Sequence, residues 1–131
     1  MITKGETYII GEIGQNHNGS VDVAKLIVEL ISRPVKEETF GIDLKPMNAV
    51  KMTKRDLNEE LTNSQMNRIY DNPNSFGRTY GEHRAFLELD DEAHYEVYKY
   101  AKEKGLDFVE TLCARSEEHT SNSSHVRTSR M

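Results

Sequence analysis

Three short apolar runs alternate with two helical patterns, and this order constrains the fold more than any other feature of the sequence. The runs are TYIIGEIG (7–14), AVKMTK (49–54) and LDFVETLC (106–113). Each has the length of a buried strand, and the first is rich in β-branched isoleucine and ends at a glycine. The sequence therefore predicts three strands.

Two segments between these runs carry apolar residues at helical spacing. The first covers 21–33, follows Ser20 as its predicted N-cap and ends before Pro34. The second covers 90–105, with acidic residues in its first turn, lysines in its last turn and Gly105 as its stop. The predicted order is therefore β-α-β-α-β, which is typical of parallel strands joined by helical crossovers.

A parallel sheet of this kind begins either a Rossmann-like fold or a (β/α)8 barrel. In both folds, ligands bind at the carboxyl ends of the strands. Polar side chains lie at or near the ends of all three predicted strands, at 12–17, 51–55 and 110–111. We therefore expect these groups, Glu110 included, to converge on one rim.

Composition narrows the class of protein. The chain has 131 residues, of which 36% are apolar and 30% charged, and its net charge is −5. The negative charge argues against a nucleic-acid-binding surface, and no apolar stretch is long enough to span a membrane. The single Cys113 excludes an internal disulfide. We expect a soluble, cytoplasmic protein.

Two connections between the predicted elements are polar. Residues 34–48 are punctuated by prolines, and residues 55–89 are rich in Asn, Asp and Arg. A polar loop as long as the second is unusual in a compact domain, and a function carried by the loop is one standard reason for it.

The last segment, 115–131, does not have the pattern of a folded protein. It contains one apolar residue, Val126, before the final Met131, and it lacks periodicity. Its letters resemble the translation of a common sequencing adapter. We therefore expect 1–114 to be the native part of the chain and 115–131 to be a non-native, disordered tail that packs on nothing.

Four stretches resemble the sialic acid (N-acetylneuraminate) synthase family, in the order and at the spacing of that family. They are GEIGQNHNG (11–19), NAVKMTKRD (48–56), NPNSFGRTYGEHRAFLEL (72–89) and YAKEKGLDFVETLCA (100–114). The resemblance implies that 1–114 are the first β-α-β-α-β portion of a (β/α)8 TIM barrel, truncated after the third strand. The connection at 34–48 is longer than the short turn that is usual in the family.

The same resemblance implies a transferase of carbohydrate biosynthesis. The family condenses phosphoenolpyruvate with an N-acylated amino sugar, such as N-acetylmannosamine, to a nine-carbon 2-keto acid and phosphate. A divalent cation, Mn²⁺ or Mg²⁺, assists the reaction, and its ligands lie on later strands that this chain lacks. The complete protein is expected to be a homodimer, and we expect this chain alone to be inactive.

Two other functions fit the same residues. In one, the fold is the same but the acceptor is a di-N-acetylated bacterial sugar, so that the product is legionaminic or pseudaminic acid. In the other, the chain is a non-catalytic α/β module that binds an anion at its polar rim. The sequence alone leaves both open.

Five residues match site positions of the family. Glu12, an acid within an apolar strand, is expected to be catalytic and to face the sugar, or else to be a structural acid bonded to a loop. Lys51 and Thr111 are expected to bind phosphoenolpyruvate; the alternative for Lys51 is an exposed strand lysine, and the alternative for Thr111 is an ordinary β-forming residue. Asn16 and His17 either bind substrate or hold the first βα loop. None of the five is expected to bind a metal.

Two further predictions concern histidines outside these positions. The motif TYGEHR (79–84), which contains His83, either folds toward the rim or forms a solvated loop with Tyr80 as its only anchor. His94 lies among Glu and Tyr residues on the second helix, and we expect it at the surface or half buried.

Overall fold

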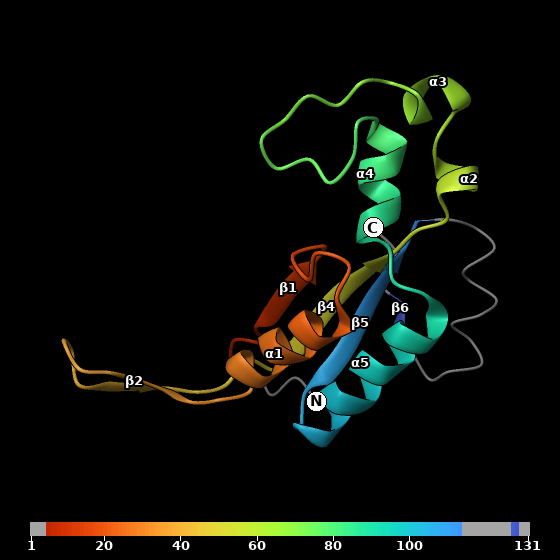
Figure 1. The fold of residues 1–131 in the computed structure, drawn as a ribbon. Helices are drawn as coiled ribbons and strands as arrows, with labels where there is room; N and C mark the ends of the chain where they lie inside the picture. Colours follow the sequence, from red (N-terminus) through yellow and green to blue (C-terminus); the bar gives the residue numbers. More distant parts are fainter. Residues whose placement is uncertain (1–4, 114–126, 129–131) are drawn as a thin grey trace.

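The computed structural model describes residues 5–113 and 127–128, and its main feature is a parallel sheet with helices on one face. The strands run in the order β1-β4-β5-β6, and α1 and α5 cover the sheet (Figure 1). These elements are β1 (Ile10–Gly14), α1 (Val21–Ile31), β4 (Ala49–Lys54), α5 (Asp91–Glu103), β5 (Asp107–Leu112) and β6 (Arg127–Thr128). The predicted β-α-β-α-β order and its parallel sheet are confirmed.

Both long helices begin and end at residues that the sequence marks. The Ser20 hydroxyl accepts a hydrogen bond from the Val23 N–H at 3.3 Å, and the Asp90 carboxylate accepts one from the Ala93 N–H at 2.8 Å. After α5, Gly105 has a φ of +78°, a conformation that residues with a Cβ rarely adopt. Local chemistry therefore fixes where the two helices cross back over the sheet.

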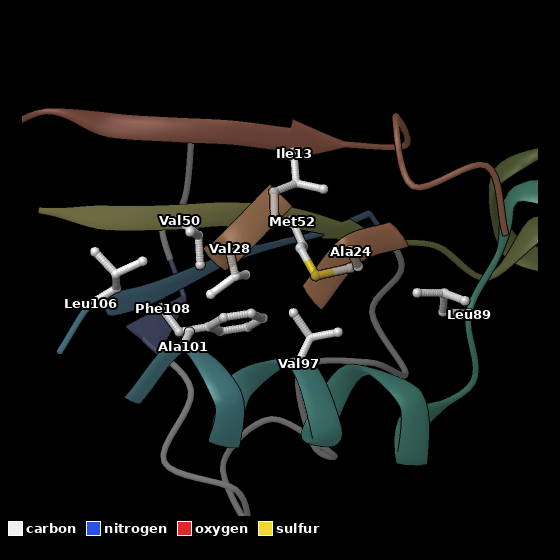
Figure 2. Packing of buried hydrophobic residues seen from close by; sticks show 10 residues of the cluster. All are labelled: Ile13, Ala24, Val28, Val50, Met52, Leu89, Val97, Ala101, Leu106 and Phe108. Atoms are coloured by element: carbon white, nitrogen blue, oxygen red, sulfur yellow. The ribbon is translucent and has the colours of Figure 1, made fainter. Parts of the chain in front are cut away.

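The hydrophobic core lies between the sheet and the two helices (Figure 2). Sheet residues in this core include Ile13, Val50, Met52 and Phe108. Side chains alternate along a strand, so the neighbours of these residues point to the opposite face of the sheet. We call this opposite face the inner face. Apart from Asp107 at the start of β5, its polar residues are Glu12, Lys51, Thr53 and Thr111.

The connection at 34–48 is an antiparallel hairpin that projects away from the sheet (Figure 1). Its strands are β2 (Val35–Glu37) and β3 (Ile42–Leu44). The Glu37 carboxylate accepts hydrogen bonds from the N–H groups of Thr39 and Phe40, and Gly41 has a φ of +64°. These contacts close a turn that the sequence analysis did not predict.

The connection at 55–89 contains three helices, so the prediction of a continuous loop is wrong. They are α2 (Leu57–Glu60), α3 (Asn63–Met66) and α4 (Tyr80–Leu87). Helix α4 begins at a capping box, in which Thr79 and Glu82 satisfy each other's backbone N–H groups. The capping box was visible in the sequence as T-x-x-E. Figure 1 shows α4 beyond the carboxyl ends of the strands.

The expectation that the tail packs on nothing is wrong for Arg127–Thr128. These two residues form β6, which pairs in parallel with β5 opposite Val109 and Glu110. Without them, β5 has an edge of unpaired N–H and C=O groups, and such an edge accepts an extended segment within reach. The rest of 115–131 lies outside the described residues.

All helices of the described ranges are short. The longest, α5, has 13 residues, and it carries charged side chains. Among the described residues, no helix has the length and apolar character needed to cross a membrane.

Candidate functional site

Glu12 and Lys51 form an ion pair on the inner face. They lie opposite each other in the register of β1 and β4, and Lys51 Nζ donates to Glu12 Oε2 at 2.6 Å. The side chain of Lys51 is 22% exposed and that of Glu12 is 48% exposed. The two residues predicted to bind different substrates therefore lie side by side.

This ion pair is better suited to binding than to stabilising the fold. Partly exposed ion pairs contribute little to stability, because water screens them. An ammonium group has three donors, and one contact with Glu12 leaves two for another anion. Lys51 is also held rigidly at its base, because its strand neighbours Val50 and Met52 are fully buried.

Thr111 adds an unsatisfied hydroxyl to the inner face. It lies on β5 in register with Thr53 of β4, two residues beyond Val109, which pairs with Lys51. Its Oγ1 is buried and has no hydrogen-bond partner among the described residues. Buried hydroxyls in native proteins nearly always have a partner. A group from outside the described residues, such as a ligand oxygen, is the natural partner for Thr111.

Asn16 and His17 lie in the loop after β1, and both bond to their own loop. The Asn16 amide donates to the Ile13 carbonyl at 2.9 Å, and the Gly19 N–H donates to His17 Nδ1 at 3.1 Å. His17 is 1% exposed, and burial lowers its pKa, with His94 as a second cause. Of the two predicted alternatives, this geometry favours holding the loop. Neither side chain belongs to the inner face.

A polar network missed by the sequence analysis joins this loop to α4. The Gln15 amide donates to Glu88 at 2.6 Å and accepts from Arg84 at 2.7 Å. The other carboxylate oxygen of Glu88 accepts from the Arg55 N–H at 3.2 Å, and burial raises the Glu88 pKa. Gln15 lies within the GEIGQNHNG motif, between the predicted site residues Glu12 and Asn16. This place in the motif was the signal that could have identified it.

Arg55, which directly follows β4, is a further cation at the carboxyl end of this strand. It forms an ion pair with Glu60 of α2. The Nε of Arg55 and the Oε2 of Glu60 are buried and lack a hydrogen-bond partner within the described part of the chain. Burial also raises the pKa of the nearby Cys113 thiol. The sequence analysis included Arg55 only within the polar range 51–55 and assigned it no role of its own.

The TYGEHR motif folds toward the rim, as one of the two alternatives predicted. Arg84 reaches Gln15, and both Arg84 and Arg68 lie over the Tyr80 ring, at 5.7 and 5.0 Å from its centre. His83 stacks on Phe76. Tyr80 is therefore one of several anchors of this segment.

Two predictions for the buried side of the sheet are wrong. His94 is 6% exposed, and its Nδ1 contacts the Glu110 carboxylate, so it is neither a surface nor a half-buried residue. Glu110 is 5% exposed and faces α5 instead of the rim. The reason is alternation along β5, because Thr111 on the inner face requires Glu110 on the helix face.

The described residues do not provide a metal site. No group of three or more His, Cys, Asp or Glu side chains in 5–113 and 127–128 is arranged to hold an ion. Apart from Asp107 at the start of β5, the inner face offers one carboxylate, one ammonium and two hydroxyl groups, which do not suit a divalent cation without further ligands. The divalent cation implied by the resemblance therefore does not fit these residues alone.

Comparison with known sequences finds close relatives. A family model described as the NeuB family matches residues 45–128. N-acetylneuraminate-9-phosphate synthase from Mus musculus is 37% identical over 106 residues, which is 81% of this chain and 26% of the relative. The Homo sapiens enzyme of the same name is 38% identical over 102 residues, covering 78% of this chain and 25% of the relative. The chain thus spans about a quarter of the length of these curated relatives.

Solved structures share the fold. An N-acetylneuraminic acid synthetase from Leptospira borgpetersenii, solved with citrate, matches 95% of this chain and 38% of its own, with a TM-score of 0.62 and 16% identity. The spore coat polysaccharide biosynthesis protein spsE from Bacillus subtilis matches 95% of this chain and 28% of its own, with a TM-score of 0.55 and 19% identity. The sheet and its helices therefore correspond to part of a TIM barrel.

Proposed function

The chain belongs to the NeuB family, and from that premise we propose that it forms one side of the active site of a phosphoenolpyruvate-dependent sialic acid-type synthase. The observation that carries the proposal is the Thr111 hydroxyl, which lies on the same face as Lys51 and has no hydrogen-bond partner in the described part of the chain. A hydroxyl and an ammonium group from neighbouring strands suit the phosphate or carboxylate of phosphoenolpyruvate. The ends of parallel strands are also where barrels of this kind bind their ligands.

The proposed reaction joins carbon 3 of phosphoenolpyruvate to the aldehyde carbon of an open-chain N-acylated amino sugar. The aldehyde oxygen takes up a proton, and water adds to carbon 2. The resulting tetrahedral intermediate loses phosphate by cleavage of its C–O bond and leaves a 2-keto acid. Lys51 and Thr111 bind and orient the anion, and Glu12 contacts the sugar beside it.

The proposed acceptor is N-acetylmannosamine or its 6-phosphate. Phosphoenolpyruvate adds three carbons before the aldehyde carbon, so carbon 6 of a hexosamine becomes carbon 9 of the product. The curated relatives are named for a 9-phosphate product, which requires a 6-phosphate acceptor. A di-N-acetylated sugar, giving legionaminic or pseudaminic acid, is the competing acceptor on the same fold.

The remaining parts of the proposal concern groups outside the described residues. We propose a cytoplasmic homodimer that uses Mn²⁺ or Mg²⁺. No step above is assigned to the cation, because the described residues do not form its site. Asn16 and His17 are assigned to the shape of the first βα loop at the substrate rim.

The test is phosphate release by a full-length protein that continues the chain through the remaining barrel strands. Phosphoenolpyruvate and Mn²⁺ are supplied with N-acetylmannosamine, its 6-phosphate or a di-N-acetylated hexose in parallel reactions. Phosphate release that depends on one of these sugars supports the proposal and identifies the acceptor. If the protein binds phosphoenolpyruvate but releases no phosphate with any sugar, the anion-binding module is the better account.

A further inference from the structure

His94 and Glu110 form a buried polar pair on the helix face of the sheet. His94 of α5 is 6% exposed, Glu110 of β5 is 5% exposed, and His94 Nδ1 contacts Glu110 Oε1. The geometry suits an Nδ1–H that donates to the carboxylate, because an ionised carboxylate only accepts. This contact ties the first turns of α5 to the carboxyl end of β5.

The pair is a poor choice if its only purpose is stability. His94 Nε2 is buried, and no described residue provides it with a hydrogen-bond partner. Burying polar groups costs free energy unless they are paired, and apolar residues of similar volume often stabilise as well or better. A polar pair does, however, fix one geometry more narrowly than apolar packing does, because its contact is directional.

Glu110 is the strand neighbour of Thr111. Successive side chains of a strand point to opposite faces, so the position of Glu110 against α5 sets the position of Thr111 on the inner face. One residue beyond β5, the Cys113 N–H donates to the Lys54 carbonyl at 3.0 Å. The end of β5 is thus held by His94 on its helix face and by β4 at its edge.

We propose that His94 and Glu110 are positioning residues, which hold the end of β5 so that the Thr111 hydroxyl meets the anion of phosphoenolpyruvate. This proposal rests on the proposed function, because it assigns Thr111 to that substrate. Neither residue touches substrate, since the pair lies between α5 and the sheet and the inner face is on the other side of the sheet.

The first test measures kinetics in the full-length protein. His94→Phe removes the donor, and we expect the KM for phosphoenolpyruvate to rise about tenfold while kcat and the KM for the sugar change much less. His94→Asn places an amide N–H near the Nδ1 position and should recover most of the loss. The matched control is Glu96→Gln, which also changes α5 but breaks only the ion pair of Glu96 with Lys25 of α1, and it should change neither constant.

A double variant separates positioning from stability. His94→Phe/Glu110→Leu replaces the whole pair with apolar groups, and its Tm should exceed that of His94→Phe, because no buried carboxylate is left without a partner. Its KM for phosphoenolpyruvate should nevertheless stay raised. A KM that returns to the wild-type value together with the Tm would overturn the proposal, since stability would then explain the whole effect.

Hydrogen exchange tests the same inference without activity. In His94→Phe, we expect the Cys113 amide at the carboxyl end of β5 to exchange at least tenfold faster. The Asp107 amide, which begins β5 and donates to the Asn48 carbonyl at 2.9 Å, should be unchanged and serves as the control. Equal exchange at Cys113 in both proteins contradicts the positioning role. A wild-type protein that releases no phosphate contradicts the proposed function instead, and the exchange result then still decides what the pair holds.

Discussion

The two faces of the sheet are built from the same strands and differ in what they can do. On the helix face, Ile13, Met52 and Phe108 pack against α1 and α5 (Figure 2). On the inner face, Glu12 and Lys51 pair at partial exposure. Because side chains alternate along each strand, a residue that packs in the core is next to one that faces the candidate site. The comparison indicates that substitutions one position apart should affect different properties.

The largest expected effect is on the helix face. Phe108→Ala empties a site where the side chain is 4% exposed, and we expect the free energy of unfolding to fall by about 3–5 kcal/mol. Phe40→Ala at the hairpin turn is the matched control, because Phe40 is 78% exposed, and it should change stability by less than about 0.5 kcal/mol. Urea unfolding measures both. Equal losses would mean that the two phenylalanines do not differ in burial.

Glu12→Gln should give the next largest effect, and on activity instead of stability. The substitution keeps the size of the side chain and removes its charge, so we expect kcat to fall about a hundredfold. The Tm should stay close to that of the wild-type protein, because the ion pair with Lys51 is partly exposed. Full activity of this variant would make Glu12 a structural acid.

Lys51→Met sharpens the same contrast. It keeps most of the aliphatic stem and removes the ammonium group, and the KM for phosphoenolpyruvate should rise about tenfold or more, as for a lost charge-assisted hydrogen bond. Lys45→Met is the control, because Lys45 pairs only loosely with Glu6, at 3.6 Å and with both side chains well exposed. An unchanged KM in Lys51→Met would remove Lys51 from the site.

The smallest effect is on the outer surface of the helix layer. Glu29 of α1 accepts from Lys104, Arg33 and Tyr100, and these bonds, with Lys104 first, lower its pKa from 4.5 to about 2. A folded-state pKa below the unfolded value contributes stability above pH 4.5 that is lost as the pH falls toward 2. Glu29→Gln should therefore lower the Tm slightly at pH 7, and thermal unfolding should show the difference vanishing near pH 2. A constant difference across this range would exclude the ionised carboxylate as its cause.

The sequence predicted the parts of the fold that depend on local chemistry. Ser20 was predicted as an N-cap, the acidic residues at 90–92 as the start of the second helix, and the three apolar runs as strands, because each signal lies within a few residues. Helix α4 was missed although Thr79 and Glu82 form a capping box, because the polar composition of 55–89 outweighed that signal. The hairpin at 34–48 was not predicted, because no comparable local signal was recognised in that segment.

The site was predictable where family resemblance and strand alternation agree. Glu12 and Lys51 were chosen separately, and their pairing depends on the register of β1 with β4, which no local pattern reveals. Glu110 was wrongly assigned to the rim, because its position near a strand end was considered but the direction of its side chain was not. Alternation from Thr111 would have assigned Glu110 to the helix face and indicated a buried partner such as His94.

The most direct test of the central claim, that the inner face binds phosphoenolpyruvate, is a crystal structure of the full-length protein with this substrate. An oxygen of the phosphate or carboxylate should lie within about 3 Å of both Lys51 Nζ and Thr111 Oγ1. The account is contradicted if phosphoenolpyruvate binds elsewhere and leaves the Thr111 hydroxyl without a partner.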